Sequence, residues 1–238
     1  MIHSIAFSAS AGISAGFSAV AVFNRLPPRW LCDYNEEPCE ELTSGNLRIS
    51  DYPWKPIFSV FFFLAALIFS TQSIRYALPA LSVLWLLLII AIADKKYMII
   101  PDQFVVLLAV SAVFYLPGGG SLLSPLYGAL LGGGCMLLIG IIGKIIYKKE
   151  ALGFGDVKLF AALGLITGPI GISIVLMASS LLSCAAFSGG LIRGKIKMTD
   201  TLPLGPYIAA AYFFQELFRS TIWLNTFSLS VVSFSSAM

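Results

Sequence analysis

The chain has 238 residues, of which 58% are hydrophobic and 11% are charged, and its mean hydropathy is +0.90. Soluble domains carry about 25% charged residues, so this sequence has too little charge to cover a water-facing surface and is predicted to lie in a bilayer. The net charge of +3 is small, and the cations lie beside the connections between apolar runs, which argues against nucleic acid as a partner.

The first segment is predicted to stay in the membrane, because no Lys or Arg precedes it and no clear signal-peptide cleavage site follows it. Eight apolar runs then predict an all-α, polytopic membrane protein with about eight transmembrane helices. These runs are Ile5 to Phe23, Pro56 to Ser73, Ala77 to Ala93, Gln103 to Leu116, Leu122 to Tyr147, Val157 to Ile166, Ile170 to Ile192 and Leu204 to Leu224.

The sixth run, Val157 to Ile166, is the weakest of the eight, because a helix of that length rises only about 15 Å. Thr167-Gly168-Pro169 follows it and is typical of a reversal between two helices. If the sixth and seventh runs instead formed one helix, every later connection would lie on the opposite side of the membrane.

The distribution of Lys and Arg predicts the orientation. If the connection after the first run is cytoplasmic and the sides alternate, the cytoplasmic connections and the helix ends beside them hold all the cations except Arg75 and Arg219. This bias obeys the positive-inside rule. Both termini are then expected outside, and Asp94, Asp102 and Asp156 are expected at the cytoplasmic face.

The longest polar segment, residues 24–55, is predicted to be a cytoplasmic loop of a single membrane domain that spans residues 1–238. Cys32 and Cys39 form a C-x6-C pair with no second pair, so a closed zinc site lacks ligands and no metal is predicted. An acidic cluster in this loop is interpreted as a solvated face, with attraction of a basic peptide as the alternative; it consists of Glu36, Glu37, Glu40 and Glu41.

Four acidic residues lie in or beside apolar runs, where ionisable groups are costly and usually functional. Asp102 follows Pro101 and stands where an N-cap would satisfy the first amides of the fourth run, so capping is favoured over catalysis. Glu216 precedes Arg219 by one helical turn, which favours a structural ion pair.

The other two acids are candidates for chemistry. Asp94 ends a long apolar run without a turn residue beside it, although Lys95 and Lys96 could reach back to it. Asp156 follows Gly153 and Gly155, which permit unusual backbone angles or close approach of another segment, and it could equally cap the sixth run.

A pair of carboxylates can hydrolyse an amide bond without a metal or an activated Ser or Cys. One carboxylate deprotonates a water molecule while a second, protonated one donates to the scissile carbonyl. Two carboxylates held close together cannot both ionise, so such a pair supplies the acid and the base together. Asp94 and Asp156 both lie at predicted cytoplasmic helix ends, and helix packing can bring them together.

These residues resemble the prepilin peptidases, which are intramembrane aspartyl proteases of the GxGD type. The resemblance covers most of the chain and rests on four motifs, Gly153-Phe154-Gly155-Asp156-Val157-Lys158, Asp94 placed before Ile100-Pro101-Asp102, Pro203-Leu204-Gly205-Pro206-Tyr207, and Phe23-Asn24-Arg25-Leu26-Pro27. It implies that Asp94 and Asp156 are the catalytic pair. Gly153, Gly155 and Asp102 then belong to the supporting motifs.

The resemblance also implies a substrate and a location. Family members cleave the basic leader of type IV prepilins or pseudopilins, after a Gly, at the cytoplasmic face of the bacterial inner membrane, and proteolysis needs no cofactor. Many members also methylate the new N-terminus with S-adenosylmethionine and carry two C-x-x-C pairs in the first loop. This loop has only Cys32 and Cys39. Zinc binding and methyl transfer therefore remain open.

Two other classes of function remain as alternatives. In a small cation or proton transporter, the intramembrane acids would bind ions, and inverted halves would be expected. A non-catalytic assembly factor of a type IV pilus or type II secretion system would tolerate loss of both aspartates.

Overall fold

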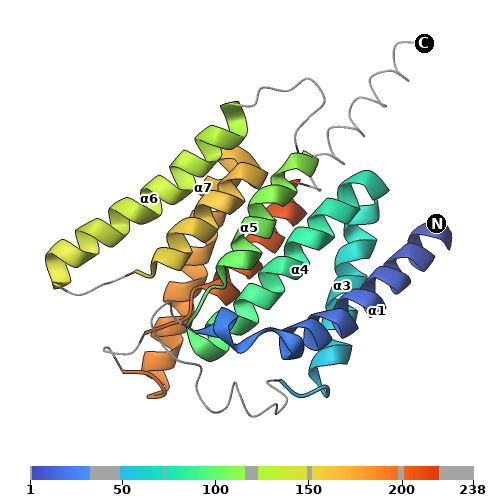
Figure 1. Cartoon of the computed structure of the whole chain (residues 1–238), viewed down its shortest axis with the longest axis horizontal. Helices are drawn as coiled ribbons and strands as arrows, with labels where there is room; N and C mark the ends of the chain where they lie inside the picture. The colour runs from blue at the N-terminus through green and yellow to red at the C-terminus, as the bar shows by residue number, and fades with distance from the viewer. Residues whose placement is uncertain are drawn as a thin grey trace. The chain divides into compact units, whose positions relative to one another are not determined.

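The structure, a computed structural model, describes residues 2–32, 49–71, 73–115, 123–148, 152–197 and 201–219. Regular structure within these residues is helical, with no strand, and this confirms the all-α prediction (Figure 1). The elements are α1 (Ile2–Arg25), η1 (Pro28–Leu31), α3 (Trp54–Ser70), α4 (Ile74–Tyr97), α5 (Asp102–Ser111), η2 (Ala112–Tyr115), α6 (Leu123–Tyr147), α7 (Phe154–Ile192) and a helix over residues 205–219.

Four helical segments of the described part are long and apolar enough to cross a membrane. They contain Ile5–Arg25, Ile74–Tyr97, Leu123–Ile146 and Phe154–Ile192, while Trp54–Ser70 and Asp102–Tyr115 form shorter apolar helices. Every apolar run predicted from the sequence overlaps a helix, and the sixth and seventh runs both fall in α7. The protein is therefore a multi-pass membrane protein.

One compact unit comprises Met1–Arg25, Leu47–Trp85 and Phe213–Met238. Within it α1 and α3 approach closely at two glycines, because a methyl group placed on Gly12 would lie 2.8 Å from Phe63 Cα and one on Gly16 would lie 2.3 Å from Ser59 N. The side chain of Asn24 joins the end of α1 to the segment before α3, since it donates to the carbonyl of Ile49 and accepts from its amide, both at 3.0 Å.

The second unit comprises Leu26–Asn46 and Leu86–Tyr212, and it contains α5, α6 and α7. α6 lies beside α7 (Figure 1), and the two helices meet at glycines, because a methyl group on Gly164 would lie 2.2 Å from the carbonyl oxygen of Gly128. Small residues on both helices let the two backbones approach closely, as is common where helices associate in a membrane.

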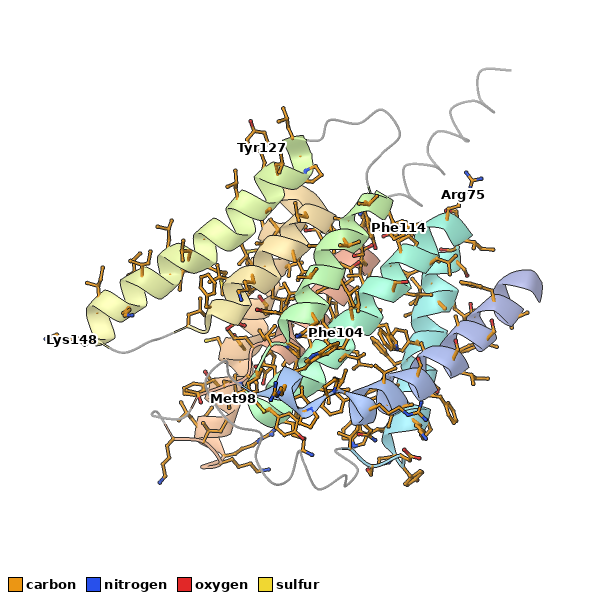
Figure 2. All side chains as sticks on the ribbon, in the orientation of Figure 1. Arg75, Met98, Phe104, Phe114, Tyr127 and Lys148 are labelled. Atoms are coloured by element: carbon orange, nitrogen blue, oxygen red, sulfur yellow. The ribbon has the colours of Figure 1, made fainter. Side chains whose placement is uncertain are left out.

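The opposite side of α6 carries exposed apolar side chains. In Figure 2 they project outward along the helix between the labelled Tyr127 and Lys148. Only 17% of the most apolar 18-residue stretch of α6 is buried, and Leu130 and Ile145 are 71% and 72% exposed. An apolar helix face of this size suits hydrocarbon rather than water.

α7 is two helices joined at Gly168, whose φ of 68° and ψ of −177° are compatible only with glycine. A methyl group on Gly132 would lie 2.5 Å from Phe160 O and 2.8 Å from Ile172 Cγ1. Phe160 and Ile172 would be about 18 Å apart along a straight helix, so the chain reverses at Gly168. The reversal predicted at Thr167-Gly168-Pro169 is confirmed, and the alternative of one merged helix is wrong.

Candidate active site

Asp94 lies in the last turn of α4, which continues past the predicted end at Ala93 to Tyr97. Met98, labelled in Figure 2, ends the helix with φ 58°, and its amide donates to the carbonyl of Asp94 at 2.8 Å. This left-handed residue is a common way for a helix to stop. The side chain of Asp94 is buried, and the residue is 6% exposed.

The carboxylate of Asp94 meets the start of the helix over residues 205–219. Its Oδ2 atom accepts a hydrogen bond from the amide of Gly205 at 2.6 Å. The carbonyl of Leu204 accepts from Tyr207 and Ile208, so Gly205 is at the first turn, where amides lack partners within the helix and attract anions. A methyl group on Gly205 would lie 2.9 Å from Oδ2 and 3.0 Å from Cβ of Asp94, so this approach requires a glycine.

Asp156 lies in the first turn of α7. The N-cap residue of α7 is Gly153, which makes no side-chain cap, and the amide of Asp156 donates to its carbonyl at 3.1 Å. The alternative that Asp156 caps the helix is therefore wrong. Its Oδ1 atom is buried and has no hydrogen-bond partner within the described residues, and its carboxylate lies within electrostatic reach of Asp94. The structure thus places the two predicted acids within electrostatic reach of each other.

The two glycines before Asp156 differ in their surroundings. A methyl group on Gly155 would lie 3.0 Å from Cβ of Ile100, whereas one on Gly153 would make only an ordinary contact of 3.5 Å with Oδ2 of Asp156. Neither glycine has a positive φ. Close approach, one of the two predicted alternatives, therefore explains Gly155, and the alternative of unusual backbone angles is wrong for both residues.

Asp102 is the first residue of α5 and makes no side-chain cap, because Pro101 occupies the N-cap position. The capping role predicted for Asp102 is wrong. Its carboxylate instead accepts hydrogen bonds from Nζ of Lys158 at 2.9 Å and 2.8 Å. Lys158, which lies on α7, donates to both carboxylate oxygens. A hydrogen bond from a charged ammonium group is stronger than one from a neutral amide at the helix start. Lys158 belonged to the GxGD motif in the sequence but was not predicted as its partner.

Glu216 pairs with Arg219 at 3.9 Å, as predicted. The sequence did not show that Glu216 is fully buried or that the hydroxyl of Tyr76 donates to its Oε2 atom. These residues belong to the first unit, so the Glu216 pair is a feature separate from the aspartates described above.

The structure describes only part of the first polar loop. Cys39 and the acidic cluster of Glu36, Glu37, Glu40 and Glu41 lie outside the described residues. Cys32 is described, and its thiol donates to the carbonyl of Pro28 at 3.1 Å. No group of three or more His, Cys, Asp or Glu side chains gathers in the part of the chain that the structure covers.

The site therefore contains two acids on different helices, close enough for their charges to interact. Asp94 is held by a backbone amide, and Asp156 has an unpaired buried oxygen. Two close carboxylates share one proton, so one can act as a base and the other as an acid. This is the equipment for hydrolysis of an amide by an activated water molecule.

Comparisons with known proteins agree with this chemistry. Residues 81–188 match the type IV leader peptidase family, and this range includes Asp94 and Asp156. The leader peptidase HopD of Escherichia coli is 37% identical over 50% of this chain and 79% of that protein, and HopD of Salmonella typhimurium is 34% identical over 53% and 83%. The prepilin leader peptidase/N-methyltransferase of Aeromonas hydrophila is 29% identical over 84% of this chain and 75% of that protein. No solved structure matches the chain.

Proposed function

The chain belongs to the type IV leader peptidase family, and we propose that it is an intramembrane aspartyl prepilin peptidase in which Asp94 and Asp156 are the catalytic pair. The observation that carries this assignment is that the two acids lie within electrostatic reach of each other. They come from the end of α4 and the start of α7, their charges interact, and Oδ1 of Asp156 is buried without a partner. A buried acceptor atom of this kind fits a site that binds water or substrate.

In the proposed reaction the ionised member of the pair removes a proton from a water molecule, which attacks the scissile carbonyl carbon. The protonated member donates to the carbonyl oxygen, and the proton taken from water then passes to the leaving amine as the C–N bond breaks. The amide of Gly205 fixes the orientation of the Asp94 carboxylate during these steps. The unpaired Oδ1 of Asp156 is the atom that faces the water in this proposal.

The relatives indicate the substrate, and the charge pattern indicates the location of the site. The relatives are named leader peptidases and prepilin leader peptidases, so the substrate is a prepilin or pseudopilin with a basic leader. The bias of Lys and Arg supports a position of the aspartates at the cytoplasmic face of the bacterial inner membrane in this proposal. The same bias supports about eight crossings and a cytoplasmic loop at 24–55. A single membrane domain over residues 1–238 is supported by a sequence in which no low-complexity linker divides the chain.

Cleavage by two carboxylates uses no cofactor. The printed name of the Aeromonas hydrophila relative adds an N-methyltransferase activity, so S-adenosylmethionine is a candidate second substrate. Measuring the mass of the new N-terminus with and without S-adenosylmethionine distinguishes cleavage alone from cleavage followed by methylation.

The test replaces each aspartate by Asn, which keeps the size of the side chain and removes its acid–base function. We expect Asp94→Asn and Asp156→Asn to lower cleavage of a co-expressed prepilin by at least about 10²-fold to 10⁴-fold, with normal membrane insertion. Asp51→Asn is the matched control. Asp51 is exposed, and within the described residues it forms an ion pair with Lys55. It should cleave at the wild-type rate.

Full cleavage by either aspartate variant would refute the catalytic pair. A non-catalytic assembly factor would tolerate both substitutions while still supporting assembly. A transporter would instead show ion flux in proteoliposomes without cleavage of the prepilin, and the flux would depend on the same acids.

A further inference from the structure

An ion pair joins the helix that carries Asp156 to the segment that follows Asp94. Nζ of Lys158 lies 2.9 Å and 2.8 Å from the two carboxylate oxygens of Asp102. Lys158 stands two residues after Asp156 in α7, and Asp102 is the first residue of α5, directly after the connection from α4. The two side chains are 33% and 32% exposed, so the pair lies at the edge of the protein interior.

A second contact lies along the same seam. Gly155 approaches Ile100, two residues before Asp102, so closely that a methyl group would lie 3.0 Å from Cβ of Ile100. The connection from α4 to α5 is therefore held against the first turn of α7 by an apolar contact and by the ion pair. Asp94 stands before this connection and Asp156 stands in this first turn, so both contacts join the two segments that carry the acids.

The contacts of Lys158 indicate that its ammonium group binds another part of the protein rather than the substrate. Its Nζ atom donates to both carboxylate oxygens of Asp102, and the centroid of the Phe154 ring lies 5.2 Å from Nζ.

We propose that Lys158 and Asp102 are positioning residues, which hold the first turn of α7 so that Asp156 meets Asp94 at the distance needed for one water molecule. This inference rests on the proposed function of that aspartate pair. Positioning residues of this kind act on the chemical step and not on substrate binding, because a small displacement of a reacting group lowers the rate without removing any contact to the substrate.

The experiment measures kcat and KM for cleavage of a purified prepilin by the full chain in detergent. Lys158→Met and Asp102→Asn should each lower kcat by about 10-fold or more, with KM within about twofold of wild type. The double variant should lose no more than either single variant, because the two residues act through each other. Lys158→Arg and the charge-swapped variant, Asp102→Lys with Lys158→Asp, should recover most of the activity.

Lys55→Met is the matched control, since Lys55 forms a comparable ion pair with Asp51 at 2.6 Å in the other unit. It should leave kcat unchanged. An unchanged kcat in Lys158→Met would overturn the proposal, as would a rise of KM alone, which would make Lys158 a substrate contact. Losses that add in the double variant would also overturn it.

Poor folding of the single variants does not prevent a decision. In that case activity in Lys158→Arg or in the charge-swapped variant supports the positioning pair, and loss of activity in both refutes it. The Asn variants of Asp94 and Asp156 separate the two proposals. If they are inactive while Lys158→Met is fully active, only the positioning pair fails; if they are active, the catalytic assignment fails.

Discussion

The backbone amide of Gly205 donates to Oδ2 of Asp94 across 2.6 Å, although 111 residues separate them in the sequence. The contact joins the end of one helix to the start of another at the proposed reacting group. A free amide at a helix start stabilises a carboxylate, and the absence of a side chain on Gly205 permits the approach. The motif Pro203-Leu204-Gly205-Pro206-Tyr207 therefore contacts the proposed catalytic aspartate directly.

Gly205→Ala should impair the chemistry more than the fold. The added methyl group would lie 2.9 Å from Oδ2 of Asp94, so either the carboxylate or the helix start must move. A displacement of this size lowers the rate by about 10-fold to 100-fold. The kcat for prepilin cleavage by purified protein measures this loss.

Gly189→Ala is the control for Gly205→Ala, because a methyl group at Gly189 would meet no atom within 4 Å. It should retain the wild-type rate. Equal rates for the two alanine variants would show that the contact between Gly205 and Asp94 has no effect on catalysis.

The two glycines of the GxGD motif should respond differently to alanine. Gly155→Ala forces a methyl group to 3.0 Å from Ile100 Cβ at the start of α7, so Asp156 is displaced and kcat should fall by about 10-fold or more. Gly153→Ala makes only a normal contact at a residue with φ −69°, and it should stay within about threefold of wild type. Both are measured by the same cleavage assay.

A larger loss in Gly153→Ala than in Gly155→Ala would contradict this steric explanation. It would mean that Gly153 is needed for a conformation other than the one described, in which its backbone angles are open to any residue.

Close packing of α6 and α7 should make Gly164 sensitive to substitution. In Gly164→Ala the methyl group would lie 2.2 Å from the carbonyl oxygen of Gly128 and 2.7 Å from the amide nitrogen of Ala129, and backbone atoms cannot rotate away. The helices must separate, at a cost of about 1–3 kcal/mol. Thermal unfolding in detergent should show a lower midpoint.

Gly134→Ala provides the comparison on α6, because a methyl group there would meet no atom within 4 Å. Its unfolding midpoint should equal or slightly exceed that of wild type, since alanine is the better helix former by about 1 kcal/mol. If both variants unfold at the wild-type temperature, the two helices are not packed as described.

Tyr76→Phe should destabilise the first unit. Tyr76 donates to Oε2 of Glu216, which is fully buried, and the unpaired carboxylate oxygen left by Phe costs about 1–3 kcal/mol. Arg219→Gln should cost less, about 0–1 kcal/mol, because Arg219 is 39% exposed and lies 3.9 Å from Glu216. Thermal unfolding compares the two variants, and a larger shift for Arg219→Gln would reverse their assigned importance.

Properties that depend on neighbouring residues could be predicted from the sequence. Apolar runs and the placement of Lys and Arg predicted a multi-pass helical protein, because the cost of exposing polar backbone to lipid is set segment by segment. Gly168 and Pro169 indicated the reversal within α7, since their backbone preferences are local. The pairing of Glu216 with Arg219 followed from helical spacing.

The partners of the acidic residues depended on the tertiary structure. Asp102 was predicted to cap its own helix by a local rule, but it binds Lys158, 56 residues away in the sequence, because helix packing supplies a cation with a stronger hydrogen bond. Gly155 needs to be a glycine because of Ile100, and Asp94 is held by Gly205. Hydropathy and motif spacing carry no information about which distant amide or ammonium group meets a given carboxylate, and only the packed helices determine it.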